Sequence, residues 1–130
     1  MEYLVYKDSD KKIFFEYQYD FNKEYLMFLL SVQIKNFSGE QEFYLYADSV
    51  RELTEQLDKI YKSDSGEVTI NDSDSESRLT VCMNSINDVR LIGQMGGMSD
   101  DIRMSFDTKI DQTSVLLIKN ILLSAYSSIT

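Results

Sequence analysis

The apolar residues of this chain follow two spacings, one of two positions and one of three to four positions. The two spacings follow each other in the same order twice along the chain. Each time, four segments in which apolar and polar residues alternate are followed by one segment whose apolar residues lie three and four positions apart. Period-two alternation is typical of a half-buried strand, and the longer spacing is typical of one face of a helix. The pattern therefore predicts the order β-β-β-β-α followed by β-β-β-β-α.

The predicted strands are short, and turn-forming residues such as those at 36–39 separate some of them. The expected strands are residues 2–7, 13–20, 26–34, 42–46, 68–70, 78–84, 89–93 and 101–107, and the expected helices are residues 49–62 and 112–126.

Both helices carry signals at their N-termini. Ser49 and Glu52 have the spacing of a capping box, in which each side chain accepts a hydrogen bond from a backbone N–H of the first turn. Asp111 or Thr113 is the expected N-cap of the second helix. The apolar residues of the second helix cover a wide arc, so we expect most of that helix to be buried.

This order predicts an α+β protein made of two β-β-β-β-α units, with antiparallel sheets packed around shared helices. We expect one domain over residues 1–130, with the first unit at 1–63 and the second at 64–130. Neither unit could bury its apolar faces alone, and the chain has no proline-rich linker, since it contains no proline. The order resembles that of the whirly and PUR-type folds.

The charge of the chain limits the partners that it can bind. Asp and Glu number 22 against 13 Lys and Arg, a formal net charge of −9. Nucleic acids and anionic membranes are disfavoured because both bind through cations. A basic protein would be attracted instead, although acidity can also serve solubility alone.

Three features that bear on cellular location are a disulfide, a signal peptide and a membrane-spanning segment, and the sequence indicates none of them. Cys82 is the only cysteine, so no intramolecular disulfide can form, as is usual in a reducing cytosol. The N-terminus has no basic start followed by a long apolar stretch, and the most apolar run, residues 25–30, is too short to span a bilayer. We expect a cytoplasmic protein.

The residues that usually carry catalysis are scarce. The chain contains no histidine, which removes the commonest general base and metal ligand, and one cysteine cannot form a zinc site. Two carboxylate pairs, Asp72 with Asp74 and Asp100 with Asp101, are candidates for acid–base work, but adjacent carboxylates in polar loops are usually solvated. We expect a protein that is not an enzyme and has no metal or cofactor.

One acidic loop resembles the start of a calcium-binding EF-hand loop through Asp72, Asp74 and Glu76. Position 6 of that motif would be Ser77 in place of glycine, and position 12 would be Met83 in place of glutamate. An acidic loop without calcium is therefore the preferred interpretation.

Tyrosine and phenylalanine concentrate in the first half of the chain. Aromatic side chains can stack on single-stranded nucleic acid, but they do so in a positively charged groove, and the neighbours here are acidic. A role in the core or at a protein interface is favoured. The tyrosines at alternating positions are Tyr6, Tyr17, Tyr19, Tyr44 and Tyr46.

The second half of the chain contains the stretch Phe-Asp-Thr-Lys-Ile-Asp-Gln-Thr at residues 106–113, in which the Asp-Gln-Thr step is the distinctive part. This stretch and the helix after it resemble the closing strand and helix of WapI-type immunity proteins, which belong to bacterial polymorphic and contact-dependent toxin systems. The acidic start and apolar spacing of residues 48–57, the Gly-led strand at 66–70 and the two strands within 79–93 agree with it. The resemblance covers about residues 40–123.

The resemblance implies a cytosolic inhibitor that masks a toxin domain delivered by a neighbouring cell. Such domains are often nucleases with basic surfaces, which a protein of net charge −9 would complement. We expect the contacts to come from acidic loops, namely Asp72, Asp74, Glu76, Asp100 and Asp101. The alternatives are a whirly-like module for single-stranded nucleic acid, a small-ligand or scaffold domain with a site between the sheets, and a carboxylate-dependent enzyme.

Overall fold

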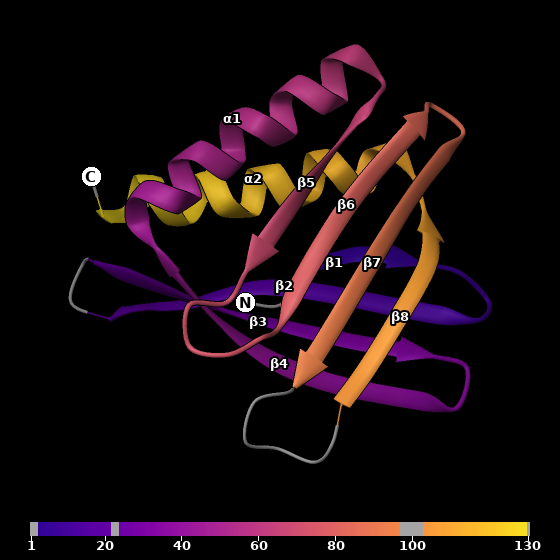
Figure 1. Ribbon diagram of the computed structural model, residues 1–130, viewed down its shortest axis with the longest axis horizontal. Coiled ribbons are helices and arrows are strands. Elements are labelled where there is room, and N and C mark those ends of the chain that lie inside the picture. Colours follow the sequence, from indigo (N-terminus) through magenta and orange to yellow (C-terminus); the bar gives the residue numbers. More distant parts are fainter. Residues whose placement is uncertain (1–2, 22–23, 97–102, 130) are drawn as a thin grey trace.

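The computed structural model describes residues 3–21, 24–96 and 103–129, and it contains two four-stranded antiparallel sheets, each followed by a helix (Figure 1). The first sheet has the order β1-β2-β3-β4 and the second the order β5-β6-β7-β8. The predicted order of elements and the α+β class are confirmed. The elements are β1 (Leu4–Lys7), β2 (Lys11–Phe21), β3 (Tyr25–Ile34), β4 (Phe37–Tyr46), α1 (Ala47–Ser63), β5 (Gly66–Asn71), β6 (Arg78–Ser85), β7 (Asp88–Gly96), β8 (Arg103–Ile110) and α2 (Gln112–Ile129).

The helices bring the two units together. Although α2 follows the second sheet, it packs on β1 and β2 of the first sheet, and it also packs against α1. In turn, α1 contacts β5 of the second sheet as well as β4. Figure 1 shows α2 lying between α1 and the first sheet. The predicted packing of both sheets around shared helices is therefore confirmed.

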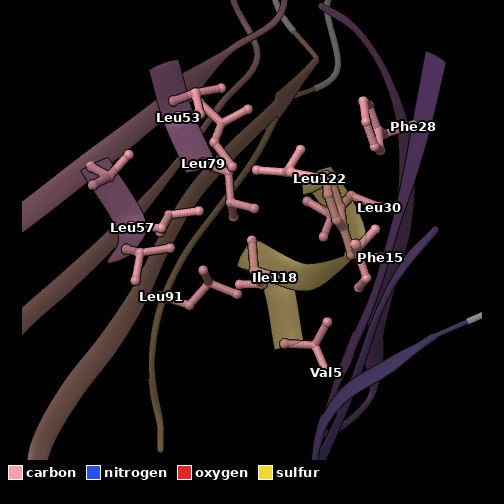
Figure 2. Close-up of a cluster of buried hydrophobic side chains, with 14 of the residues drawn as sticks. Val5, Phe15, Phe28, Leu30, Leu53, Leu57, Leu79, Leu91, Ile118 and Leu122 are labelled. Carbon is pink, nitrogen blue, oxygen red and sulfur yellow. The ribbon is translucent and has the colours of Figure 1, made fainter. Parts of the chain in front are cut away.

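A single hydrophobic cluster runs through both units (Figure 2). Phe15 and Phe28 of the first sheet stack with ring centroids 5.2 Å apart. Leu122 of α2 is fully buried and lies near them, and Leu79 of β6 is fully buried in the same cluster. Since each unit contributes part of one core, neither unit could keep its apolar face away from water without the other.

The first sheet contains an irregularity that simple alternation does not predict. The register between β2 and β3 shifts between Tyr17 and Tyr19, so Tyr17 pairs with Phe28 while Tyr19 pairs with Met27. The partners are adjacent in β3 instead of two residues apart. A β-bulge of this kind breaks the period-two pattern, and the uniform alternation expected over residues 13–20 therefore ends at Tyr17.

The capping box predicted for α1 is wrong. The helix begins at Ala47, its N-cap is Tyr46, and no side chain caps it. Ser49 consequently lies inside the first turn. The Ala47 N–H instead donates to the backbone oxygen of Glu24 at 2.9 Å, so the residue just before β3 satisfies one of the N–H groups at this helix end.

Asp111 is confirmed as the cap of α2, where its Oδ1 accepts a hydrogen bond from the Ser114 N–H at 2.9 Å. The buried Ser114 hydroxyl lies 2.8 Å from the backbone oxygen of Val5, to which it can donate. This bond joins α2 to the first strand. None of the helices in the described residues is long and apolar enough to cross a membrane.

Candidate partner-binding surface

The first sheet turns one face toward the helices and an outer face away from them. The outer face carries tyrosines and other large side chains together with carboxylates, because the pairing of β2, β3 and β4 aligns these residues in rows across the strands. Glu42 and Glu40 are exposed on it. The outer-face positions of these three strands up to the bulge are Lys12, Phe14, Glu16, Tyr25, Met27, Leu29, Ser31, Gln33, Ser38, Glu40, Glu42, Tyr44 and Tyr46.

Two tyrosines at one end of this face form a pair. Tyr25 and Tyr46 lie opposite each other on β3 and β4, with ring centroids 4.5 Å apart and an interplanar angle of 38°. The Tyr25 hydroxyl donates to the Tyr46 hydroxyl at 2.9 Å, and Tyr46 remains 50% exposed. A large aromatic ring is thus presented to solvent in a fixed orientation.

The surroundings of the pair are electronegative. The hydrogen bond to Tyr46 is the main reason that the pKa of the Tyr25 hydroxyl is raised, with burial second. The negative charges of Glu24 and Asp74 raise this pKa further. Asp74 directly follows Ser73, whose N–H donates to the backbone oxygen of Tyr44 at 3.0 Å. A surface depression of about 320 Å³ beside Tyr46 is lined by Glu24, Tyr46, Ala47 and Asp48.

We call Glu24, Tyr25, Tyr46, Asp48 and Asp74 the tyrosine–acid patch. Its residues come from the start of β3, the end of β4, the first turn of α1 and the loop between β5 and β6. Four separate segments therefore meet at one place on the surface. The patch has an aromatic centre and a charged rim, which is the usual anatomy of a protein-binding hot spot.

Asp72 links the loop between β5 and β6 to β4, the edge strand of the first sheet, through a hydrogen bond. This residue is only 7% exposed, and its Oδ1 accepts a hydrogen bond from the Tyr44 N–H at 2.8 Å. Its Oδ2 accepts one from the Ser75 hydroxyl at 2.5 Å. Ser73 adds a backbone hydrogen bond from its N–H to the Tyr44 oxygen at 3.0 Å. The Asp72 carboxylate thus positions the loop, and its burial leaves little of it for a partner to touch.

The other predicted contact residues are separated by the fold. Asp74 is exposed and its charge acts on Tyr25, whereas Glu76 forms an ion pair with Arg103 of β8 at 3.3 Å. The loop therefore directs one carboxylate toward the first sheet and one toward the second. Asp100 and Asp101 lie outside the described residues.

Sequence reasoning did not identify Tyr25, Glu24 and Asp48 as site residues. Tyr46 was expected in the core or at an interface, and its 50% exposure fits the second of these. The signal that was available is positional: Tyr25 begins one strand and Glu24 directly precedes it, while Tyr46 and Asp48 lie where the next strand joins a helix. An antiparallel pairing of these two strands brings those ends together.

The outer face of the second sheet is built differently. Arg90 and Asp107 form an ion pair at 2.7 Å, and Asp107 raises the pKa of the Arg90 guanidinium. The hydroxyls of Thr69 and Thr80 lie 2.9 Å apart and share a hydrogen bond. On this face, the two opposite charges pair with each other and the two hydroxyls bond to each other.

Two observations concern the reactive side chains of the described residues. Burial is the main cause that raises the pKa of the Cys82 thiol, which keeps this thiol protonated and poorly nucleophilic at neutral pH. Within residues 3–21, 24–96 and 103–129, no group of three or more Cys, Asp or Glu side chains is placed to hold a metal ion.

Comparison with known proteins identifies the family. A comparison with curated proteins gave no match. The model of the immunity protein WapI-like family matches residues 13–123, which include most of β2 and all of β3 and β4 of the first sheet as well as most of the second half, on which the resemblance rested. The match covers most of the chain, and the protein therefore belongs to the WapI-like family of immunity proteins.

Proposed function

We propose that this protein is a cytoplasmic immunity protein that binds a cognate toxin domain and masks its active surface. The family match carries this proposal, because immunity proteins act on toxins. We further propose that the toxin belongs to a contact-dependent or polymorphic system of bacteria. Such inhibition needs a rigid complementary surface of about 1,600 Å² and no catalytic group.

The toxin is proposed to be basic and of the nuclease type. The net charge of −9 supports this, since a nuclease needs cations to hold phosphates and an acidic inhibitor complements those cations. The proposed contacts from the acidic loops are Asp74, Glu76, Asp100 and Asp101. Asp72 is assigned a positioning role, because its carboxylate is hydrogen-bonded to Tyr44 and Ser75.

Co-expression tests the proposal directly. The toxin domain encoded next to this protein is expressed in bacteria with and without the immunity protein, and growth is measured together with gel filtration of the purified pair. We expect rescued growth and one complex peak. Continued killing together with separate elution of the two proteins would refute the proposal.

A further inference from the structure

We propose that the tyrosine–acid patch receives an arginine side chain of the toxin, with the guanidinium lying over the exposed ring of Tyr46. This inference rests on the function proposed above and names the place where the partner is anchored. The occupant is a cation because the patch combines an accessible aromatic ring with three carboxylates.

The ring geometry suits a planar cation. Cations are attracted to the faces of tyrosine rings, and arginine is used in this way more often than lysine. Tyr46 is half exposed, and Tyr25 holds it by ring contact and by the 2.9 Å hydrogen bond between hydroxyls. A ring that is already fixed loses little side-chain freedom on binding, which favours a high contribution to affinity.

The charges of the patch point to the same occupant. Glu24 and Asp48 line the depression beside Tyr46, and the exposed Asp74 follows Ser73, which is hydrogen-bonded to the Tyr44 backbone. The N-terminus of α1, which starts at Ala47, contributes only about half a positive charge, and Asp48 in its first turn offsets it. The balance at the patch is therefore negative, and a guanidinium is stabilised there by both the ring and the carboxylates.

The opposite end of β4 provides a contrast. A larger depression of about 440 Å³ lies there, lined by Phe37, Met104 and Phe106 among others, and Phe37 is 73% exposed. Its charged lining residue is Arg103, which would repel a cation. An exposed aromatic residue at each end of one strand thus gives a matched pair of substitutions.

The test uses the purified toxin–immunity complex and measures Kd for Tyr46→Ala, Tyr46→Phe and Phe37→Ala. We expect Tyr46→Ala to weaken binding by about 10- to 30-fold, which is typical of a hot-spot residue. Tyr46→Phe keeps the ring and should stay within about 3-fold, as should Phe37→Ala. Thermal melting of each free variant checks that it folds.

The cation is then identified on the toxin. Each arginine of the toxin surface is changed to alanine and combined with Tyr46→Ala in a double-mutant cycle. We expect one arginine whose loss has almost no further effect once Tyr46 is gone. If every arginine has the same effect with and without Tyr46, the inference is overturned.

The outcomes separate this inference from the proposed function. Absence of a complex with the unmodified protein overturns both. A normal complex whose Kd is unchanged by Tyr46→Ala overturns the anchor alone. If Tyr46→Ala does not fold, the double variant Asp48→Asn, Asp74→Asn is measured instead, and unchanged affinity in that variant also overturns the anchor.

Discussion

The two sheets share one strand order but treat charge in opposite ways on their outer faces. On the first sheet, Glu40 and Glu42 are exposed, and Glu42 accepts a hydrogen bond from the uncharged Tyr44 hydroxyl at 2.8 Å. On the second sheet, Arg90 pairs with Asp107 at 2.7 Å. This ion pair cancels its own charge, while the exposed carboxylates of the first sheet keep a negative field that acts on other molecules.

The difference between the two outer faces shows how one architecture, repeated twice, can provide an acidic surface and an ion-paired surface. Both inner faces must be apolar because they share one core, so the inner faces of the two units resemble each other. The outer faces do not have to be apolar. The outer face of the second sheet can therefore be stabilised by its own ion pair, while the outer face of the first sheet can bind a partner.

The largest effect is expected from reversing one charge on the first sheet, at Glu42, and one in the loop beside it, at Asp74. The double variant Glu42→Lys, Asp74→Lys should weaken toxin binding by about 100-fold at low salt, mostly through slower association, because two attractive charges become repulsive. The difference from the unmodified protein should shrink as salt is added. Stopped-flow association rates at several ionic strengths measure this effect.

The matched control lies on the second sheet. Exchanging the partners of its ion pair, as Arg90→Asp with Asp107→Arg, leaves the net charge unchanged and keeps opposite charges together. We expect association within about 2-fold of the unmodified protein, since exposed ion pairs contribute little. An equal loss in both variants would remove the distinction between the faces.

A second effect, on stability, compares a glycine in each sheet. A Cβ on Gly93 of β7 would lie 2.4 Å from ring atoms of Phe106, whereas one on Gly39 of β4 would lie 2.9 Å from Sδ of Met104. An aromatic ring in a sheet has less room to shift than a flexible thioether. Gly93→Ala should therefore lower the free energy of unfolding by about 1–3 kcal/mol and Gly39→Ala by less than about 1 kcal/mol.

Urea unfolding of both variants measures that difference, with the slope of the transition as a check on two-state behaviour. Equal midpoints for Gly93→Ala and Gly39→Ala would show that the Phe106 ring can move aside. The two sheets would then be equally tolerant on their inner faces.

Periodicity in the sequence predicted the elements because periodicity is what a buried face requires. Alternation such as Leu79, Val81 and Met83 correctly predicted β6, and all three residues are buried. The strand pattern depends on local spacing alone. The expectation that most of α2 is buried is wrong: the helix contacts β1, β2 and α1, but Leu123 stays 44% exposed. Its buried residues are Ser114, Val115, Ile118, Ile121, Leu122 and Ala125.

Contacts between distant segments could not be predicted in this way. The Glu24 oxygen accepts from Ala47, and Asp72 accepts from Tyr44, so residues more than twenty positions apart decide a helix start and a loop position. Asp72 was expected to contact a partner through its negative charge; its 7% exposure and its bond to Tyr44 are features that the sequence did not predict, and its contact with a partner stays a prediction. The tyrosine–acid patch depends on similar long-range pairing.

The third prediction concerns the loop that borders the first sheet. Asp72→Ala removes the acceptor of the buried Tyr44 N–H and should cost about 1–2 kcal/mol of stability, while Asp72→Asn keeps an Oδ1 acceptor and should cost less. Hydrogen exchange at the Tyr44 amide should accelerate more in Asp72→Ala than in Asp72→Asn. Equal exchange in both variants would mean that the loop is held by Ser73 alone.

The smallest effect concerns Asp58, whose ion pair with Lys119 joins the helices of the two units and whose ion pair with Lys62 lies within α1. Asp58 of α1 contacts Lys62 at 2.8 Å and Lys119 of α2 at 3.1 Å, and hydrogen bonds from these lysines, Lys62 first, lower the pKa of the Asp58 carboxyl. A lowered pKa in the folded state stabilises the protein fully above the unfolded value of about 3.9, and this contribution is lost as pH falls through the folded pKa.

Asp58→Asn should therefore lower stability slightly near neutral pH and have no effect in strong acid, because there the carboxyl of the unmodified protein is protonated as well. Urea midpoints between pH 7 and pH 2 measure the difference, and Glu55→Gln on the same helix controls for the loss of one negative charge. A difference that stays constant across this range would mean that Asp58 acts through packing. The contact between α1 and α2 would then contribute equally to stability at every pH in this range. The charges of the two units would differ in effect only on their outer faces.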